Sequence, residues 1–496
     1  MSNMTNKYEP VIGLEIHAVL ETKSKLFCAC EVLDSTTQKA NSAVCPVCTG
    51  MPGVLPVVNK KVVEFAIRLA AALKCEISLT SIFARNSYFY PDIPKGYQIS
   101  QYEQPLAING SINIETSLGE QNIQITRVHL EEDTGKLTHI HTEKEDYSLV
   151  DLNRSGMPLL EIVSEPVIHS AESARAYAFG LRNIMRYLGV NSGNLEKGLF
   201  RIEPNISIRP IGSEKFGTRV EIKNLNSFRA LERGIEYEIK RQTELLDQGL
   251  PVVQQTLGWD EELQITVPQR SKEDAEDYRY FPEPDLPPLV LSEEWVQEIK
   301  SSLPELPFTR FKRFQEAYQL SSYDAQVLTN EKAVADYFED VVITAKSVSP
   351  KTISNWLTGD LFALMNQKNI LIESLEISPQ AFAKLLQMLE GDEINQNTAK
   401  KVLSEMLTNG KDPAQIVKES GLGQVSDLGQ IEDLVDQIIN SNPLQVKAYL
   451  EGKTNLAKWM FGQVMKLADG KANPQMIQKI LNERLQVLEK EKSPNK

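Results

Sequence analysis

Alternating apolar and polar residues recur in five separated stretches, and this pattern limits the possible folds more than any other feature of the sequence. A period of two places successive side chains on opposite faces of a β-strand. The apolar positions are mostly isoleucine, leucine and valine, whereas the polar positions carry acids, amides and arginines. We therefore predict an antiparallel sheet with an apolar back and a polar front that binds ions and phosphate. The stretches are residues 9–22, 123–130, 148–153, 201–209 and 219–223.

An acidic cluster follows the second stretch, in the sequence RVHLEEDTGK of residues 127–136. Glu131, Glu132 and Asp133 stand side by side at the point where we expect the strand to break. Adjacent carboxylates repel unless a cation balances them, and oxygen-rich clusters suit Mg²⁺ with a bound nucleotide. Strand phase favours Glu131 as a ligand, but phase is unreliable at a strand end, so Glu132 remains a candidate. The alternative is an acidic strand end in water.

Glu15 and His17 offer a further pair of ligands. They lie two residues apart in the alternating stretch 9–22, so they share a strand face at a spacing of roughly 6–7 Å. A carboxylate and an imidazole at that spacing can converge on one divalent ion, although the same pattern fits a surface pair on a half-solvated strand. Charge and strand face also point to a set of phosphate and nucleotide contacts. These are Lys95, Arg154, Arg201, Glu203, Asn205 and Lys223.

Four of the five cysteines form two tight pairs, C-x-C and C-x-x-C. Cys28 and Cys30 are separated by fourteen residues from Cys45 and Cys48. Four thiolates in two close pairs match the tetrahedral sulfur site of zinc, and such a closed site is structural because no ligand position is left for water. The alternative is four buried or unreactive thiols. We predict a structural Zn²⁺ knuckle.

Length and charge bound the remaining possibilities. A chain of 496 residues is too long for one ordinary core, so several domains are expected. No apolar run approaches the roughly 20 residues of a membrane span, and the first residues lack a signal-peptide core. We therefore expect a cytoplasmic protein with no membrane contact. The net charge of −14 excludes a wholly basic nucleic-acid coat but not a local basic surface.

Helical spacing dominates the rest of the chain. Residues 170–188 and 227–248 have helical periodicity between the predicted strands, and residues 292–407 read as helices with short turns. The segment 445–496 is also helical and contains ten Lys and Arg against five Asp and Glu, a net charge of +5. This local reversal of charge favours a polyanionic partner such as RNA, although a solvated basic helix would have the same composition.

Six ordered motifs carry a resemblance to a known family. They are GLEIHAVLETKSKLF, FYPDIPKGYQISQ, ITRVHLEEDTGK, YSLVDLNRSGMPLLEIVSEP, EIKNLNSF and GQVMKLADGKANPQ. From about residue 8 onward the chain resembles the GatB/GatE family, whose members are components of tRNA-dependent amidotransferases. The resemblance implies an α+β fold in three parts. A catalytic cradle domain similar to glutamine synthetase would span residues 1–295, with the zinc knuckle at 28–48, followed by a helical domain at 296–407 and a YqeY-like tRNA-binding tail at 408–496.

The resemblance also implies a function. Such a protein works in a heterotrimer with a glutaminase and a small third subunit, as a ligase that forms C–N bonds with glutamine as the amido donor. It uses ATP and Mg²⁺ to phosphorylate the side-chain carboxylate of misacylated Asp-tRNA(Asn) or Glu-tRNA(Gln), and ammonia then displaces phosphate. By motif, Glu15, His17 and one or both of Glu131 and Glu132 would bind Mg²⁺.

Two other interpretations remain at this stage. The chain could be a ligase for small carboxylic acids, although the charged tail and the lack of an ammonia-producing motif count against it. It could also be a non-enzymatic, zinc-containing RNA-binding scaffold, which leaves the acid-rich strand faces without a role.

Overall fold

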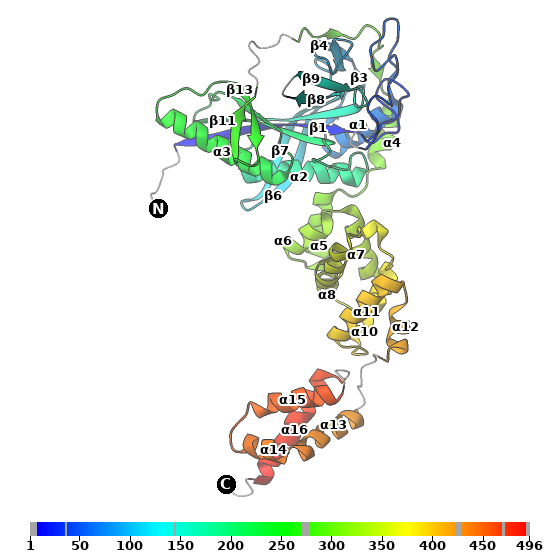
Figure 1. The fold of residues 1–496 in the computed structure, drawn as a ribbon, viewed down its shortest axis with the longest axis vertical. Helices are drawn as coiled ribbons and strands as arrows, with labels where there is room; N and C mark the ends of the chain where they lie inside the picture. The colour runs from blue at the N-terminus through cyan, green and yellow to red at the C-terminus, as the bar shows by residue number, and fades with distance from the viewer. Residues whose placement is uncertain are drawn as a thin grey trace. The chain divides into compact units, whose positions relative to one another are not determined.

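The computed structural model describes residues 7–34, 37–142, 145–269, 278–421, 428–468 and 472–492 (Figure 1). The chain divides into two compact units, Met1–Arg310 and Phe311–Lys496. The predicted α+β class is confirmed, because the first unit is built around a sheet and the described part of the second is helical.

A nine-stranded sheet forms the centre of the first unit, in the order β14-β13-β12-β11-β1-β10-β7-β6-β2. The prediction of an antiparallel sheet is wrong for one pair, since β12 and β13 run parallel. Parallel neighbours need a crossover, and the helix α3 (Phe228–Asp247) provides it. The strands are β1 (Tyr8–Val19), β2 (Glu76–Ile77), β6 (Ala107–Thr116), β7 (Gly119–Glu132), β10 (Pro158–Ser164), β11 (Phe200–Pro210), β12 (Val220–Lys223), β13 (Gln255–Asp260) and β14 (Ile265–Pro268).

Helices cover the apolar face of this sheet. Besides α3, they are α1 (Lys60–Ala72), α2 (Ala171–Leu188) and α4 (Glu293–Ser301), and α2 and α3 lie side by side (Figure 1). The helices predicted at 170–188 and 227–248 are confirmed as α2 and α3. Serine side chains cap both N-termini by accepting a hydrogen bond from the backbone three residues on. The core contains Ile12, Leu14 and Ile16 of β1 together with apolar side chains of all four helices. The polar face of β1 is therefore left for chemistry.

The strand β7 ends within the acidic cluster, as the sequence predicts, but only after Glu132, so that Glu131 and Glu132 are still part of the strand. A β-bulge at Thr126 leaves this residue without a partner on β10, because Arg127 pairs with Val163 and Ile125 with Ser164. The extra residue shifts the alternation by one. Arg127 therefore no longer shares the face of Ile125.

A second predicted strand also lies elsewhere. The stretch 148–153 does not enter the main sheet but contributes to a separate hairpin of β8 (Lys136–His141) and β9 (Asp146–Asp151). Two further small sheets border the first unit. They join β4 (Ala84–Ser87), β5 (Tyr97–Ser100) and β15 (Phe281–Pro282), and β3 (Thr80–Ser81) with β16 (Leu289–Val290).

The second unit contains helices and no strand within its described residues. Its last four helices, α13–α16, enclose a separate apolar cluster that includes Ile431, Met460 and Leu481. The domain boundaries at 295/296 and 407/408 stay predictions. The helices are α5 (Pro307–Tyr318), α6 (Ser322–Thr329), α7 (Lys332–Thr344), α8 (Pro350–Asn355), η1 (Trp356–Leu361), α9 (Phe362–Lys368), η2 (Ile372–Ser374), α10 (Pro379–Glu390), α11 (Gln396–Asn409), α12 (Pro413–Glu419), α13 (Leu428–Ser441), α14 (Pro443–Leu450), α15 (Leu456–Leu467) and α16 (Pro474–Lys492). Across the described ranges, no helix is long and apolar enough to cross a membrane.

The packing of β1 against the helices should dominate the stability of the first unit. Ile16 is fully buried at the centre of this contact, so Ile16→Ala should lower the free energy of unfolding by about 2–5 kcal/mol. Leu118→Ala is the matched control, because Leu118 is 84% exposed in the β6–β7 turn, and its effect should stay below about 0.5 kcal/mol. Denaturant unfolding followed by circular dichroism measures both, and equal effects would contradict the assignment of the core.

Candidate active site

The register of four neighbouring strands aligns polar residues across the front of the sheet. His17 on β1 lies opposite Arg201 on β11 and opposite Glu161 on β10. Glu161 in turn lies opposite His129 on β7. Directly opposed residues of antiparallel strands point to the same side, with Cβ atoms about 4.5–5.5 Å apart. The backbone register alone therefore brings two imidazoles, a carboxylate and a guanidinium into one row.

Glu131 completes a cluster with this row. The Nε2 atom of His17 lies 3.5 Å from Oε2 of Glu161 and 3.8 Å from Oε1 of Glu131. The Nε2 atom of His129 lies 3.2 Å from Oε2 of Glu161 and 3.9 Å from Oε2 of Glu131. One ligand atom each from His17, Glu131 and Glu161 lies within 4.8 Å of the others. A nitrogen and two carboxylate oxygens at this spacing form a donor set for a divalent cation.

Charge is shared unevenly inside this cluster. Burial disfavours the imidazolium of His17, but the hydrogen bond and the charge of Glu161 prevail and raise its pKa to about 9. Burial, followed by repulsion from Glu161, raises the pKa of Glu131 to about 7. Burial also opposes ionisation of Glu161, yet His129 and His17 hold its pKa well below the usual range. The cluster therefore contains protons that an incoming cation would displace near neutral pH.

Glu15 belongs to a neighbouring acidic cluster. Its carboxylate lies with those of Glu203 and Glu221, with one oxygen of each within 4.8 Å of the others. Lys223 partly neutralises this cluster, with Nζ 3.1 Å from Glu203 Oε2 and 3.4 Å from Glu221 Oε1. Asn205 donates to Oε1 of Glu15 at 2.9 Å. Burial, then repulsion from Glu161 and Glu221, raises the pKa of Glu15. Glu15 and His17 thus fall in two different groups of candidate ligands, and their joint binding of one ion stays a prediction.

Asp133 connects two of the predicted phosphate ligands. Arg154 donates to its Oδ2 atom at 2.7 Å, and Arg201 donates to its Oδ1 atom at 3.1 Å. Burial opposes the charge of Asp133, but Arg201 and Arg154 prevail and lower its pKa. Both guanidinium groups are thereby held at the edge of the His17 cluster. Their side chains remain 20% and 31% exposed, so both keep access to solvent.

Glu132 points away from this cluster, as the alternation of β7 requires. Its Oε1 atom forms an ion pair with Lys95 and accepts a hydrogen bond from the backbone N–H of Ile99 at 2.8 Å. Both charged side chains are buried, at 8% exposed for Lys95 and 3% for Glu132. Of the two neighbouring glutamates left open by the sequence, only Glu131 therefore contacts His17.

The four predicted zinc ligands lie together. The sulfur atoms of Cys28, Cys30, Cys45 and Cys48 all lie within 4.8 Å of one another. A tetrahedral site with Zn–S bonds of about 2.3 Å requires sulfur atoms about 3.8 Å apart, which this grouping can reach. The backbone N–H of Cys45 points at Sγ of Cys48, 3.2 Å away, as expected for a thiolate. The residues therefore fit a structural zinc ion.

A fully buried lysine lies beside the sulfur atoms. The Nζ atom of Lys25 is 3.6 Å from Sγ of Cys48 and donates to the carbonyl of Ala43 at 2.8 Å. A hydrogen bond from Cys28, with a further contribution from Lys25, lowers the pKa of Cys48 to about 4. The positive charge of the Lys25 ammonium group offsets part of the negative charge of a site with four thiolates.

From the sequence, no role was assigned to Glu161, His129 or Glu221, and Asp133 was placed in the acidic cluster without being named as a ligand. A signal for Glu161 was available, because it is the only charged residue in the buried strand β10. A single acid in such a strand needs a partner. The partners themselves depend on the pairing of β10 with β1 and β7, which the sequence does not specify.

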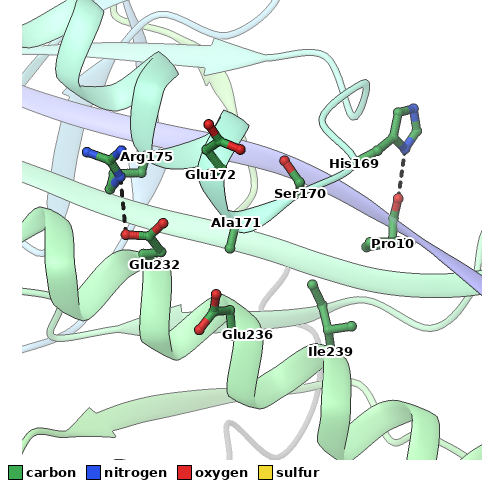
Figure 2. A pocket seen from close by; sticks show the side chains of 9 residues that line it. All are labelled: Pro10, His169, Ser170, Ala171, Glu172, Arg175, Glu232, Glu236 and Ile239. Atoms are coloured by element: carbon green, nitrogen blue, oxygen red, sulfur yellow. Dashed lines mark hydrogen bonds and ion pairs between the residues drawn. The ribbon is translucent and has the colours of Figure 1, made fainter. Parts of the chain in front are cut away.

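A surface hollow between α2 and α3 lies apart from these clusters. Figure 2 shows the nine residues that line it, and none of them is a predicted site residue. Arg175 pairs with Glu232 at 3.1 Å, and Nδ1 of His169 donates to the carbonyl of Pro10 at 2.7 Å (Figure 2). Both helices cover the apolar side of the sheet, so this hollow is not continuous with the polar face.

Comparison with known families identifies two matching regions. A family model described as the GatB/GatE catalytic domain matches residues 10–297. A second model, described as a GatB domain of the YqeY type, matches residues 336–485. The first match contains every residue of the polar clusters and the four cysteines.

Full-length relatives have closely similar sequences. A protein of Carboxydothermus hydrogenoformans is 48% identical over 97% of this chain and 99% of its own length. A protein of Persephonella marina is 48% identical over 97% of this chain and its entire length. A protein of Thermoanaerobacter pseudethanolicus is 47% identical over 97% of this chain and 99% of its own length. All three are named as the B subunit of an aspartyl/glutamyl-tRNA(Asn/Gln) amidotransferase.

The raised pKa of His17 predicts that divalent cations bind more tightly as the pH rises. The imidazolium must lose its proton to become a ligand, so the Kd for Mn²⁺ should fall between pH 7 and pH 9, by up to about tenfold per unit. In the metal-free protein the raised pKa of His17 also contributes to the free energy of unfolding. This contribution is fully present below pH 6.5 and is lost as the pH rises through about 9.

Free Mn²⁺ measured by electron paramagnetic resonance tests this dependence. His169→Ala is the control, because His169 lies beside the hollow between α2 and α3, and it should retain the wild-type slope. A Kd that does not change with pH in the wild-type protein would show that His17 is not a ligand.

Proposed function

The chain belongs to the GatB/GatE family of tRNA-dependent amidotransferase subunits, and from this premise we propose that its polar sheet face uses ATP to activate a carboxylate carried by tRNA. The family function, formation of Asn-tRNA(Asn) or Gln-tRNA(Gln) by a ligase, applies to this chain. The proposal concerns which residues perform the step and with which cofactors.

The proposed reaction has two steps. An oxygen of the aspartyl or glutamyl side chain attacks the γ-phosphorus of ATP, the bond from this phosphorus to the β–γ bridging oxygen breaks, and ADP leaves. Ammonia then attacks the acyl carbon, a C–N bond forms and phosphate departs, while a proton is lost from nitrogen. Activation is needed because a carboxylate would otherwise have to expel oxide. Such phosphoryl transfer depends mainly on alignment and charge neutralisation.

The convergence of His17, Glu131 and Glu161 supports this proposal most strongly. Two carboxylate oxygens and an imidazole nitrogen on one face of a rigid sheet form a site for Mg²⁺. Mg²⁺ bound there would neutralise charge on the phosphates of ATP. The cluster of Glu15, Glu203 and Glu221 lies on the same face and is proposed to take part in binding the nucleotide.

Cationic side chains at the edge of the cluster complete the proposed site. Arg154 and Arg201 are held by Asp133, so their charges are positioned before phosphate binds. Lys223 and Asn205 are proposed to contact nucleotide oxygens beside the second cluster. Lys95 is proposed as a further phosphate contact, and it pairs with Glu132, the residue that follows Glu131 in the chain.

The same premise supplies the partners. We propose a heterotrimer in which a glutaminase provides ammonia and a small third subunit joins the two larger ones, with misacylated tRNA as the substrate. Because the substrate belongs to translation, we propose a cytoplasmic location. We also propose a cradle at 1–295, a helical domain at 296–407 and a tRNA-binding tail at 408–496. Exposed Lys453, Lys458 and Lys479 support the role of the tail.

ATP turnover by the copurified complex tests the function as a whole. Misacylated tRNA should stimulate release of ADP, and amidated tRNA should form in equal amounts. Release of ADP with a free small acid would favour the small-molecule ligase instead. Binding of tRNA with no release of ADP under any condition would favour the scaffold.

Substitutions at the two neighbouring glutamates should have different effects. Glu131→Gln removes a proposed ligand, so it should weaken Mn²⁺ binding and lower the kcat of amidation by about a hundredfold or more. Glu132→Gln leaves Lys95 buried and unpaired, so it should mainly reduce stability, by about 3–5 kcal/mol, with Mn²⁺ affinity near normal. Mn²⁺ titration and thermal unfolding separate the two effects, and the reverse result would assign the ligand to Glu132.

The four cysteines should bind about one zinc ion per chain. Elemental analysis of protein purified without chelator measures this directly. Cys45→Ser should release the metal and lower the thermal unfolding temperature, whereas Cys75→Ser, at a buried cysteine outside the group, should leave the zinc content unchanged. Folded wild-type protein without zinc would rule out the site.

A further inference from the structure

Arg154 lies in a turn that follows β9, and the cysteine knuckle holds this turn in place. With the residues that flank the zinc knuckle of 28–48, the cysteine knuckle spans residues 26–50, of which 35 and 36 lie outside the described ranges. Asn41 forms three hydrogen bonds to the residues at the start of this turn. Its backbone N–H donates to Oδ1 of Asp151 at 2.9 Å and its Nδ2 donates to the carbonyl of Val150 at 3.0 Å. Its Oδ1 accepts from the backbone N–H of Leu152 at 2.8 Å. The end of the hairpin is thereby fixed to the knuckle.

Both sequence neighbours of Arg154 are buried and bonded to the knuckle. Asn153 is fully buried, and its Oδ1 accepts from Ala43 N–H at 2.9 Å while its Nδ2 donates to the carbonyl of Lys39 at 2.8 Å. Ser155 is 2% exposed, and its Oγ donates to the carbonyl of Cys48 at 3.0 Å. The knuckle therefore fixes the backbone on either side of Arg154, whose side chain points the other way, to Asp133.

The knuckle also contacts Lys95, another of the proposed phosphate contacts. Gly50 has a φ of 68°, and a Cβ atom added at this position would overlap Cβ of Lys95. The end of the knuckle thus packs directly on the backbone of Lys95, whose side chain pairs with Glu132. Lys25 adds a further link, because its Nζ lies near Cys48 Sγ and also 3.4 Å from the carbonyl of Leu152.

We propose that the cysteine knuckle is a positioning element for the phosphate site, which sets the location of Arg154 through Asn153 and Ser155 and that of Lys95 through Gly50. This inference rests on the proposed function, since Arg154 is a phosphate ligand only if ATP binds this face. The described residues of the knuckle form no helix or extended strand, so its shape depends on the metal and on these contacts. Displacing a positioned charge by about 1 Å can cost a hundredfold in rate.

Asn153→Ala in the intact complex tests the proposal, because it removes both side-chain bonds and no cysteine. We expect about one zinc per chain, a KM for ATP raised about tenfold and a KM for misacylated tRNA changed less than about twofold. A merely structural role would instead reduce the folded fraction, which lowers the apparent kcat and leaves KM unchanged. Asn41→Ala changes an exposed residue and should also raise the KM for ATP. This second variant tests the positioning role if Asn153→Ala does not fold.

Asp34→Asn is the matched control. It breaks another contact between the knuckle and the domain, the exposed pair of Asp34 with Lys197 at 2.7 Å, but does not touch the turn of Arg154. It should retain the wild-type KM for ATP. An unchanged KM for ATP in both asparagine variants, in a wild-type complex that does amidate, would overturn the positioning role. Loss of zinc from Asn153→Ala would also overturn it, because Asn153 would then support the metal site. Lack of ATP-dependent amidation by the wild-type complex would instead contradict the proposed function.

Discussion

The polar face of the sheet depends on the balance of buried charge across β11, β1, β10 and β7. Carboxylates removed from water are costly unless opposite charges or ions compensate them. On this face Glu161 has two imidazoles and Asp133 has two guanidinium groups, whereas Glu132, on the other side of β7, has Lys95. The antiparallel register enforces the pairings of Glu161, because it places His17 and His129 directly opposite Glu161, about 5 Å away. The sheet therefore acts as a template that fixes charges before any substrate arrives.

Two adjacent glutamates show how much depends on the phase of one strand. The bulge at Thr126 shifts the alternation of β7, so that Arg127, His129 and Glu131 share one face. Glu132 consequently lies on the other side, where its carboxylate pairs with Lys95 and accepts a hydrogen bond from the backbone N–H of Ile99. Strand β7 thus contributes His129 and Glu131 to the cluster around His17 on one face, and on the other face it holds Lys95 through Glu132.

Local patterns in the sequence were sufficient for some parts of this arrangement. The alternation of β1 correctly separated the buried Ile12, Leu14 and Ile16 from the polar Glu15 and His17, and the two serine-capped helices followed from their periodicity. Pairing between distant strands was not accessible in this way, because no local pattern specifies which strands become neighbours. Glu161 was missed for this reason. The parallel pair of β12 and β13 and the separate hairpin of β8 and β9 are likewise consequences of long-range pairing.

The cluster of His17, Glu131 and Glu161 and the cluster of Glu15, Glu203 and Glu221 differ in the cationic side chain that neutralises them. This difference explains why the first is better suited to bind a divalent metal ion. Burial opposes the charge of Lys223, but the attraction of Glu203 and Glu221 prevails and raises its pKa, which favours the charged ammonium group. A cation entering that cluster would have to displace the ammonium group physically. The imidazole of His17 can instead release a proton and leave a ligand nitrogen in the same place. Exchange of a proton for a divalent ion requires no movement of the strands, so the cluster with His17 is the better candidate for the proposed metal ion.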